Sequence, residues 1–96
     1  MVLEIKHQEN QSKGSFYIEE GLKRLGEMTY SMAGPARMII DHTEVSEALK
    51  GQGAGKQFVT AAVDYARKNN IKILPLCPFA KSVFDSVKEF GDVLDR

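Results

Sequence analysis

Hydrophobic and polar residues alternate through much of the first half of the chain, a pattern typical of strands that bury one face. The alternation predicts strands at residues 2–6 and 24–32, and short apolar runs predict strands at 15–19 and 37–45, the last with a polar exit. Polar or turn-forming stretches separate them, notably HQENQSKG at 7–14 and AGPA at 33–36. We therefore expect a meander of antiparallel strands in this half.

The second half of the chain changes to the periodicity of helices. Apolar side chains form one stripe along a helix predicted over residues 54–69, at Phe58, Val59, Ala62, Val63 and Ala66. The apolar run at 71–77 predicts a buried strand, and residues 79–90 predict a second helix. From Gly91 onward we expect a short tail or a terminal strand.

A single strand–helix–strand crossover joins the fourth predicted strand, 37–45, to the fifth, 71–77. Crossovers of this kind are right-handed and join parallel strands. The chain therefore predicts one α+β domain over residues 1–96, with a mixed, twisted sheet and the element order β-β-β-β-α-β-α.

Composition narrows the classes of function. The 96 residues include 13 basic and 13 acidic side chains, and this zero net charge disfavours charge-driven binding to nucleic acid or membranes. No apolar run approaches the roughly 20 residues of a membrane span, and the N-terminus lacks an apolar signal core, so we expect a cytoplasmic protein. One cysteine excludes an internal disulfide, and with only two histidines we expect no metal site.

Three alternating glycines, Gly51, Gly53 and Gly55, lie between the fourth strand and the long helix. Glycine allows unusual backbone angles and close approach of a ligand, and a helix N-terminus offers free N–H groups and a positive dipole. Together they predict a cradle for a phosphate or pyrophosphate, with Lys50 and Lys56 adding positive charge. The alternative to a phosphate site is a flexible loop in which the glycines only allow the chain to turn into the helix. Lys50 and Lys56 would then be ordinary surface charges.

Two familiar phosphate loops do not fit this stretch. A Walker loop needs a glycine five positions before the Gly55-Lys56 pair, where Lys50 stands, and a Ser or Thr at position 57, which is Gln57. The dinucleotide fingerprint G-x-G-x-x-G fails as well, because the spacing here is G-x-G-x-G.

The loop and its flanks resemble the GCN5-related N-acetyltransferases, whose main motif is Q/R-x-x-G-x-G/A at the start of the long helix. Here the motif reads KGQGAG at 50–55, with Lys50 in the first place. A second family element, N-x-x-A-x-x-x-Y, aligns with residues 77–84, where Cys77 replaces Asn and Phe84 replaces Tyr. DHT at 41–43, together with Cys-Pro-Phe, resembles a small stand-alone subgroup, and the resemblance covers about residues 2–90.

The resemblance implies acetyl-coenzyme A as the cofactor and a sheet whose fourth and fifth strands splay apart. The loop amides at about 51–56 would hold the pyrophosphate, and the pantetheine arm would lie between the splayed strands. The residues expected to bind the coenzyme are Val45, Lys50, Gly51, Gln52, Gly53, Ala54, Gly55, Lys56, Phe79 and Lys81. Lys81 would reach the adenosine phosphate of the coenzyme. Alternatively, its side chain lies on the solvent-exposed face of the helix and binds nothing.

Acetyl transfer to an amine needs a general base and benefits from a proton donor, and Phe84 lacks the hydroxyl that a Tyr would supply. His42 lies near the C-terminal end of the fourth strand, and an imidazole is a common general base in enzymes. Cys77 precedes a helix N-terminus, which lowers a thiol pKa. If the two strand ends meet, Cys77 could accept the acyl group with His42 as its base. Both residues also have a purely structural alternative. Cys77 would then be a small buried apolar side chain, and His42 would only form a hydrogen bond with Asp41 or Thr43.

The leading interpretation is an acyltransferase that moves an acetyl group from acetyl-coenzyme A to an amine, on a protein, a peptide or a small molecule. A second interpretation, favoured by the missing Tyr, is a module that binds coenzyme A without turnover. A third is a structural domain without a ligand. We expect a monomer or weak homodimer.

Overall fold

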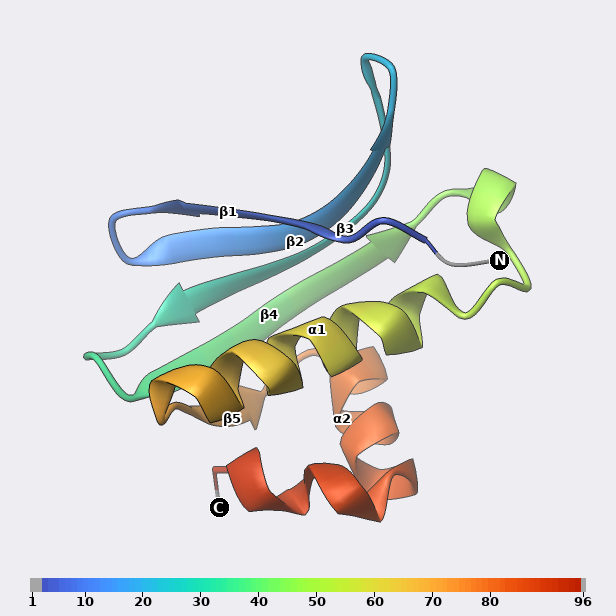
Figure 1. The fold of residues 1–96 in the computed structure, drawn as a ribbon. Helices are drawn as coiled ribbons and strands as arrows, with labels where there is room; N and C mark the ends of the chain where they lie inside the picture. Colours follow the sequence, from blue (N-terminus) through green and yellow to red (C-terminus); the bar gives the residue numbers. More distant parts are fainter. Residues whose placement is uncertain (1–2, 96) are drawn as a thin grey trace.

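The computed structural model describes residues 3–95 and has the predicted order of elements (Figure 1). The elements are β1 (Lys6–Asn10), β2 (Lys13–Glu20), β3 (Lys23–Met32), β4 (Arg37–Val45), η1 (Glu47–Leu49), α1 (Ala54–Asn69), β5 (Lys72–Pro75), α2 (Pro78–Ser86) and η2 (Lys88–Val93), where η denotes a 3₁₀ helix. The predicted α+β class is confirmed. Within the described range, no helix is both long and apolar enough to cross a membrane.

The strands form one five-stranded sheet in the order β1-β2-β3-β4-β5, with β1 to β4 antiparallel and β4–β5 parallel, as predicted. Helix α1 lies across one face of the sheet (Figure 1). Its apolar stripe packs there on the inward side chains of the central strands, and Phe58, Met28 and Ile40 are fully buried between the two layers. We call this covered side the inner face of the sheet, and the opposite side the outer face.

The first strand lies later in the chain than predicted. Residues 3–5 are not in a strand, Val2 lies outside the described residues, and the stretch expected to be a turn contains β1. All five residues of β1 are exposed, so the strand has no buried apolar stripe, and its pairing with β2 is what defines it. The turn between them is short, with Gln11 at a positive φ of 59°.

The C-terminal elements are shorter than predicted. The second helix ends at Ser86 rather than 90, because Val87 has extended backbone angles, and a 3₁₀ helix follows. After it, Leu94 forms a single parallel bridge with Ile73, so the tail makes minimal strand pairing with β5. The bounds predicted for β4 and α1, in contrast, are confirmed to the residue.

An aromatic cluster fastens the exposed strand β1 to the inner face. The His7 imidazole stacks on Phe16 with ring centroids 4.2 Å apart, and its Nε2 lies 2.5 Å from the Tyr30 hydroxyl. Beside it, the Tyr65 hydroxyl of α1 donates a hydrogen bond to Glu9, at 3.2 Å. Burial lowers the pKa of His7 even though the Glu9 carboxylate opposes this effect. The cluster therefore favours a neutral imidazole.

We expect the stability of the fold to decrease in mild acid because of His7. Its pKa is about 6.5 in the unfolded chain and lower in the folded one, so the unfolded state binds more protons between the two values. The contribution is complete above pH 6.5 and is lost as the pH falls through the folded pKa. Urea unfolding at a series of pH values measures this, and His7→Phe should flatten the dependence in that window. An equal slope in both proteins would contradict the assignment.

Candidate active site

Strands β4 and β5 pair over only four residues and then part. The parallel register runs from Arg37 opposite Lys72 to Ile40 opposite Pro75. The N–H groups of Leu76 and Cys77 both donate to the Ile40 carbonyl, at 3.0 and 3.1 Å, which turns the chain away from the sheet. Strand β4 continues to residue 45 without β5 beside it. The gap between the strands is the splay that the family resemblance implies.

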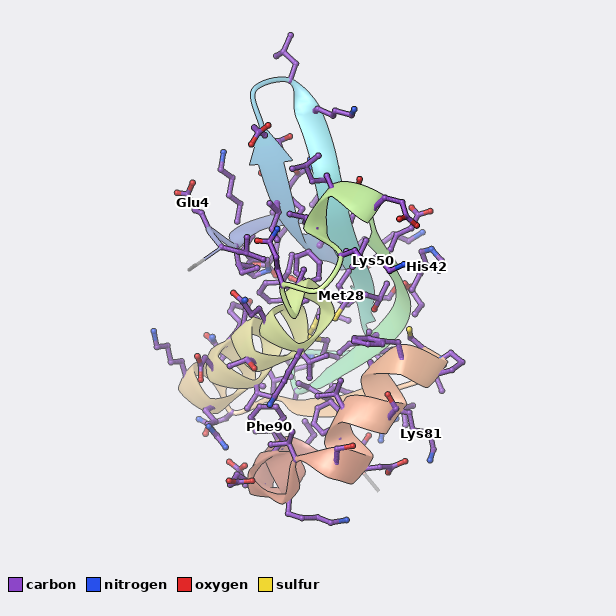
Figure 2. All side chains as sticks on the ribbon, turned by 90° about the vertical axis from the view of Figure 1, so that its right-hand side faces the viewer. Glu4, Met28, His42, Lys50, Lys81 and Phe90 are labelled. Atoms are coloured by element: carbon purple, nitrogen blue, oxygen red, sulfur yellow. The ribbon has the colours of Figure 1, made fainter. Side chains whose placement is uncertain are left out.

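A bulge in β4 determines the direction of the side chains beside this gap. Thr29 lies opposite His42 and Tyr30 lies opposite Ile40, which leaves Asp41 as the extra residue. Asp41 accepts a hydrogen bond from the Thr29 hydroxyl, so Asp41 and His42 both lie on the outer face (Figure 2 labels His42).

His42 and Cys77 therefore do not meet. Thr43 lies opposite the buried Met28 and so points to the inner face, where its Oγ1 is 3.5 Å from the Cys77 Sγ. The structure pairs the thiol with Thr43 and places His42 on the other side of β4. Thr43 is the residue that the sequence interpretation missed as a partner of Cys77.

Cys77 lies at the N-cap of α2 and is only 6% exposed. Burial disfavours its thiolate, but hydrogen bonds with the Thr43 hydroxyl and the N–H groups of Ala80 and Phe79 outweigh burial and lower the pKa of Cys77. The thiol is therefore more nucleophilic near neutral pH than a cysteine buried among apolar groups alone. Among residues 3–95, no three His, Cys, Asp or Glu side chains are grouped so that they could hold a metal ion.

The glycine loop leaves a set of backbone N–H groups free. Gly51 and Gly53 have φ of 82° and 69°, and Gly53 caps α1 without a side-chain hydrogen bond. From Gly53 onward along the chain, the first backbone N–H group that donates a hydrogen bond is that of Gln57, to the Gly53 carbonyl at 3.0 Å. Within the described residues, no acceptor is bound by the amides of Gly51, Gly53, Ala54, Gly55 and Lys56. These five free N–H groups lie where the sequence predicts an anion cradle.

Gln52 differs from its predicted role, because it holds the loop together instead of offering an amide. Its N–H donates to the Leu49 carbonyl at 3.2 Å, and its side chain donates to the Ala48 carbonyl at 3.4 Å. Its own carbonyl accepts a hydrogen bond from the Gln57 side chain at 3.2 Å. The amide of residue 52 is thus unavailable to a ligand in this structure.

A groove of about 450 Å³ lies between the glycine loop and α2. Its lining includes these predicted residues: Val45, Lys50, Gly51, Gly53, Ala54, Gly55, Lys56 and Phe79. It also includes residues that the sequence interpretation missed, among them Leu49, Ser82, Val83 and Ser86. Gln52 and Lys81 do not line it, and Lys81 is turned toward solvent, where it pairs with Asp85 at 3.3 Å (Figure 2).

Phe79 explains why position 55 needs a glycine. The Phe79 ring lies against Gly55, and any Cβ there would overlap the ring. Phe79 is also 42% exposed, so the ring forms part of the groove wall while its other side faces solvent. The close approach of α2 to the start of α1 therefore depends on a residue without a side chain.

Comparison with known proteins identifies the family. Residues 15–93 match the family model described as GCN5-related N-acetyl-transferase.

The chain belongs to the GCN5-related N-acetyltransferase family.

A GCN5-like protein of Staphylococcus aureus, solved by NMR, is 40% identical to this acetyltransferase with a TM-score of 0.75, over 97% of this chain and 88% of that one. Tetrahymena GCN5 is 20% identical with a TM-score of 0.65, over 80% of this chain and 51% of that one. The acetyltransferase AAC(6′)-Iy, solved with a coenzyme A bisubstrate analogue, is 11% identical with a TM-score of 0.54, over 91% and 65% of the two chains. The last two likenesses show the fold alone. A comparison with curated proteins gave no significant match.

The predicted family, fold and enzyme class are thus confirmed: the chain is an acyltransferase of a family that uses acetyl-coenzyme A.

Replacing Thr43 by Val should raise the pKa of Cys77. The substitution keeps the shape of the side chain and removes the hydroxyl that stabilises the thiolate. The rate of iodoacetamide alkylation as a function of pH reports the thiol pKa, and its midpoint should move to higher pH. Thr60→Val, which removes a hydroxyl bonded to the Lys56 carbonyl on α1, is the matched control and should leave the midpoint in place. An unchanged midpoint in Thr43→Val would refute the pairing.

Proposed function

We propose that this acetyltransferase moves an acetyl group from acetyl-coenzyme A to an amine, and that the groove beside the glycine loop binds the coenzyme. The observation that supports this most strongly is the set of five unpaired amides at the start of α1, because free N–H groups at a helix N-terminus favour a diphosphate. Lys50 and Lys56 line the same groove and add positive charge.

The residues present suit two parts of coenzyme A, its pyrophosphate and its pantetheine arm. The amides between Gly51 and Lys56 would bind the pyrophosphate, with Gln52 holding the loop closed behind them. The edge of β4 beyond Ile40 has no strand partner on the β5 side, so its main chain is available to the amide groups of the pantetheine arm. When bound, acetyl-coenzyme A supplies an activated acyl thioester.

The residues proposed for acyl transfer and for proton transfer lie on opposite faces of β4. Cys77 and Thr43 lie at the gap between the strands, where a thiolate held by the Thr43 hydroxyl and two α2 amides could attack the acyl carbon. A thioester would form on Cys77 as coenzyme A leaves as its thiolate, and attack by an amine would then transfer the acetyl group and release the Cys77 thiolate. His42 lies on the outer face, where it could take the proton that an attacking amine must lose. Phe84 is 4% exposed and packs on Phe90, so it contributes to the core and not to proton transfer.

The second candidate is a module that binds coenzyme A without turnover. The buried, hydroxyl-free Phe84 favours it, because no group at that position can protonate a leaving thiolate. The two candidates differ in one measurable quantity, the release of coenzyme A thiol that depends on an added amine.

Gly53→Leu should weaken acetyl-coenzyme A binding far more than it weakens the fold. A side chain at this cap would project beside the free amides, and the positive φ costs about 1–2 kcal/mol in either state of the groove. Gly34→Leu is the matched control, since Gly34 also has open space around it and a φ of 79° but lies in the β3–β4 turn. Calorimetry should show at least a tenfold loss of affinity for Gly53→Leu alone, about 1.4 kcal/mol. Equal affinities in the two variants would contradict the proposed cradle.

Incubation with acetyl-coenzyme A should add about 42 Da to the intact protein, the mass of an acetyl group on a thiol. Cys77→Ala should abolish this adduct while coenzyme binding persists. Amine-dependent thiol release without any adduct would mean that Cys77 only lines the site and that transfer is direct. Coenzyme binding with neither adduct nor thiol release would favour the binding module.

A further inference from the structure

The five free amides of the glycine loop differ in their access to solvent. Gly51, Gly53 and Lys56 are exposed, so a ligand in solution can reach this part of the loop. Ala54 is only 3% exposed and Gly55 is also buried, although neither amide has an acceptor within the described residues. Buried N–H groups are ordinarily paired, so an anion would stabilise these two most, yet they are the two that solvent reaches least.

The Phe79 ring covers Gly55. Outside the helix itself, the three nearest neighbours of a Cβ built on Gly55 would all be atoms of this ring, so the end of the ring lies against the glycine. In a helix the Cα–Cβ bond leans toward the N-terminus, and the N–H groups point the same way. The ring therefore lies on the side of Gly55 to which its free N–H group points.

The position of Phe79 in α2 allows its ring to turn away. Cys77 is the N-cap of the helix and Pro78 is the first helical residue, so Phe79 stands in the first turn. In a helix interior one χ1 rotamer clashes with the preceding turn, but no helical turn precedes Phe79. The side chain is also 42% exposed, so one direction of rotation leads into solvent. The ring can thus leave Gly55 without any movement of α2.

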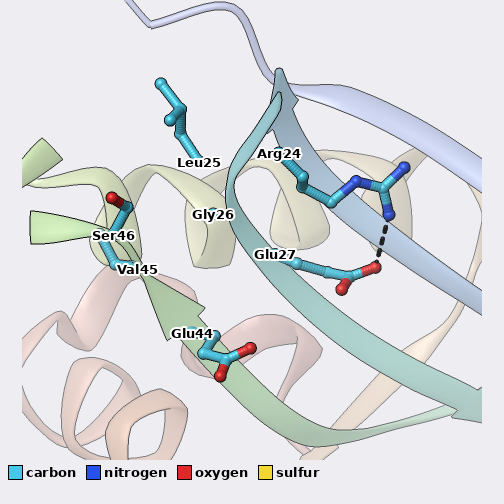
Figure 3. Close-up of a pocket in the computed structure, with 7 residues that line it drawn as sticks. All are labelled: Arg24, Leu25, Gly26, Glu27, Glu44, Val45 and Ser46. Carbon is cyan, nitrogen blue, oxygen red and sulfur yellow. Dashed lines mark hydrogen bonds and ion pairs between the residues drawn. The ribbon is translucent and has the colours of Figure 1, made fainter. Parts of the chain in front are cut away.

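The hollow drawn in Figure 3, of about 330 Å³, does not lead around the ring. It lies at the end of β4 and shares only Val45 with the groove beside the glycine loop. None of its seven lining residues belongs to the glycine loop or to α2. The groove, which Gly55 and Phe79 both line, is therefore the route by which an anion reaches the Gly55 amide.

We propose that Phe79 is a gate over the anion cradle: its ring closes on Gly55 in the free protein and turns outward when the coenzyme binds. The inference rests on the proposed function, because it takes the coenzyme pyrophosphate as the anion. The exposed amides, with Lys50 and Lys56, would receive the pyrophosphate first. Rotation of the ring then lets a phosphate oxygen reach the Gly55 N–H group. A closed population lowers the apparent affinity in proportion to the fraction of molecules that are open.

Amide hydrogen exchange without coenzyme tests whether the ring covers Gly55. In the wild-type protein the Gly55 N–H group should exchange with water about fivefold more slowly than that of Gly53, and Phe79→Ala should remove most of this difference. Leu76→Ala is the matched control, because it removes a side chain that is 62% exposed and lies just before α2 but outside the groove lining. Gly55 exchange that is the same in Phe79→Ala and Leu76→Ala would overturn the gate.

A variant at position 55 tests whether the ring can move. Only glycine fits beneath the closed ring, and the φ of Gly55 is not positive, so Gly55→Ala adds a methyl group without straining the backbone. A ring that turns freely would move outward, and the urea midpoint of unfolding should hardly change. A large decrease in the midpoint would show that the ring is fixed and would overturn the gate.

Coenzyme A binding separates the gate from the proposed function. Phe79→Ala should bind coenzyme A about threefold more tightly than the wild type in calorimetry, because the closed state no longer competes. In the wild-type complex the NOE between the Phe79 ring and Gly55 should disappear. Unchanged or weaker binding by Phe79→Ala, or an NOE that persists in the complex, would overturn the gate and leave the proposed function standing. A wild-type protein that binds no coenzyme A would refute both, even where hydrogen exchange shows the ring on Gly55.

Discussion

The parting of β4 from β5 after Ile40 and Pro75 is the constraint on which the rest of this structure depends. While the strands are paired, their backbone groups satisfy each other and nothing can enter between them. Once the Ile40 carbonyl accepts the N–H groups of both Leu76 and Cys77, the chain leaves the sheet and begins α2. This one departure opens the edge of β4, places the Cys77 thiol at a helix N-terminus, and brings α2 to the groove beside the glycine loop.

The second consequence is that β4 separates two chemical environments. The bulge at Asp41 places Asp41 and His42 on the polar outer face, while Thr43 remains on the inner face with Cys77. An amine must contact the acyl carbon to react, so it would have to enter the gap between β4 and β5. His42 and Cys77 would then act from the two sides of β4, without direct contact between them.

Much of this arrangement could be predicted from the sequence, for identifiable reasons. The helix α1 has strong apolar periodicity, and the strand β4 has an apolar middle bounded by a turn and a polar exit. The glycines of the loop mark positions where only glycine fits, as the positive φ of Gly53 and the ring against Gly55 demonstrate. Strand β1 could not be found in this way, because its polar residues bury nothing and its pairing with β2 is non-local. The partner of Cys77 was missed because a bulge changes which face each residue occupies, and no local pattern marks it.

The most direct test of the account is a crystal structure of the protein with acetyl-coenzyme A. The account predicts pyrophosphate oxygens within hydrogen-bonding distance of the amides that are free at the start of α1, and a thioester between β4 and β5 beside the Cys77 sulfur. A coenzyme whose pyrophosphate bound elsewhere on the chain, with the amides of the glycine loop still unpaired, would contradict it.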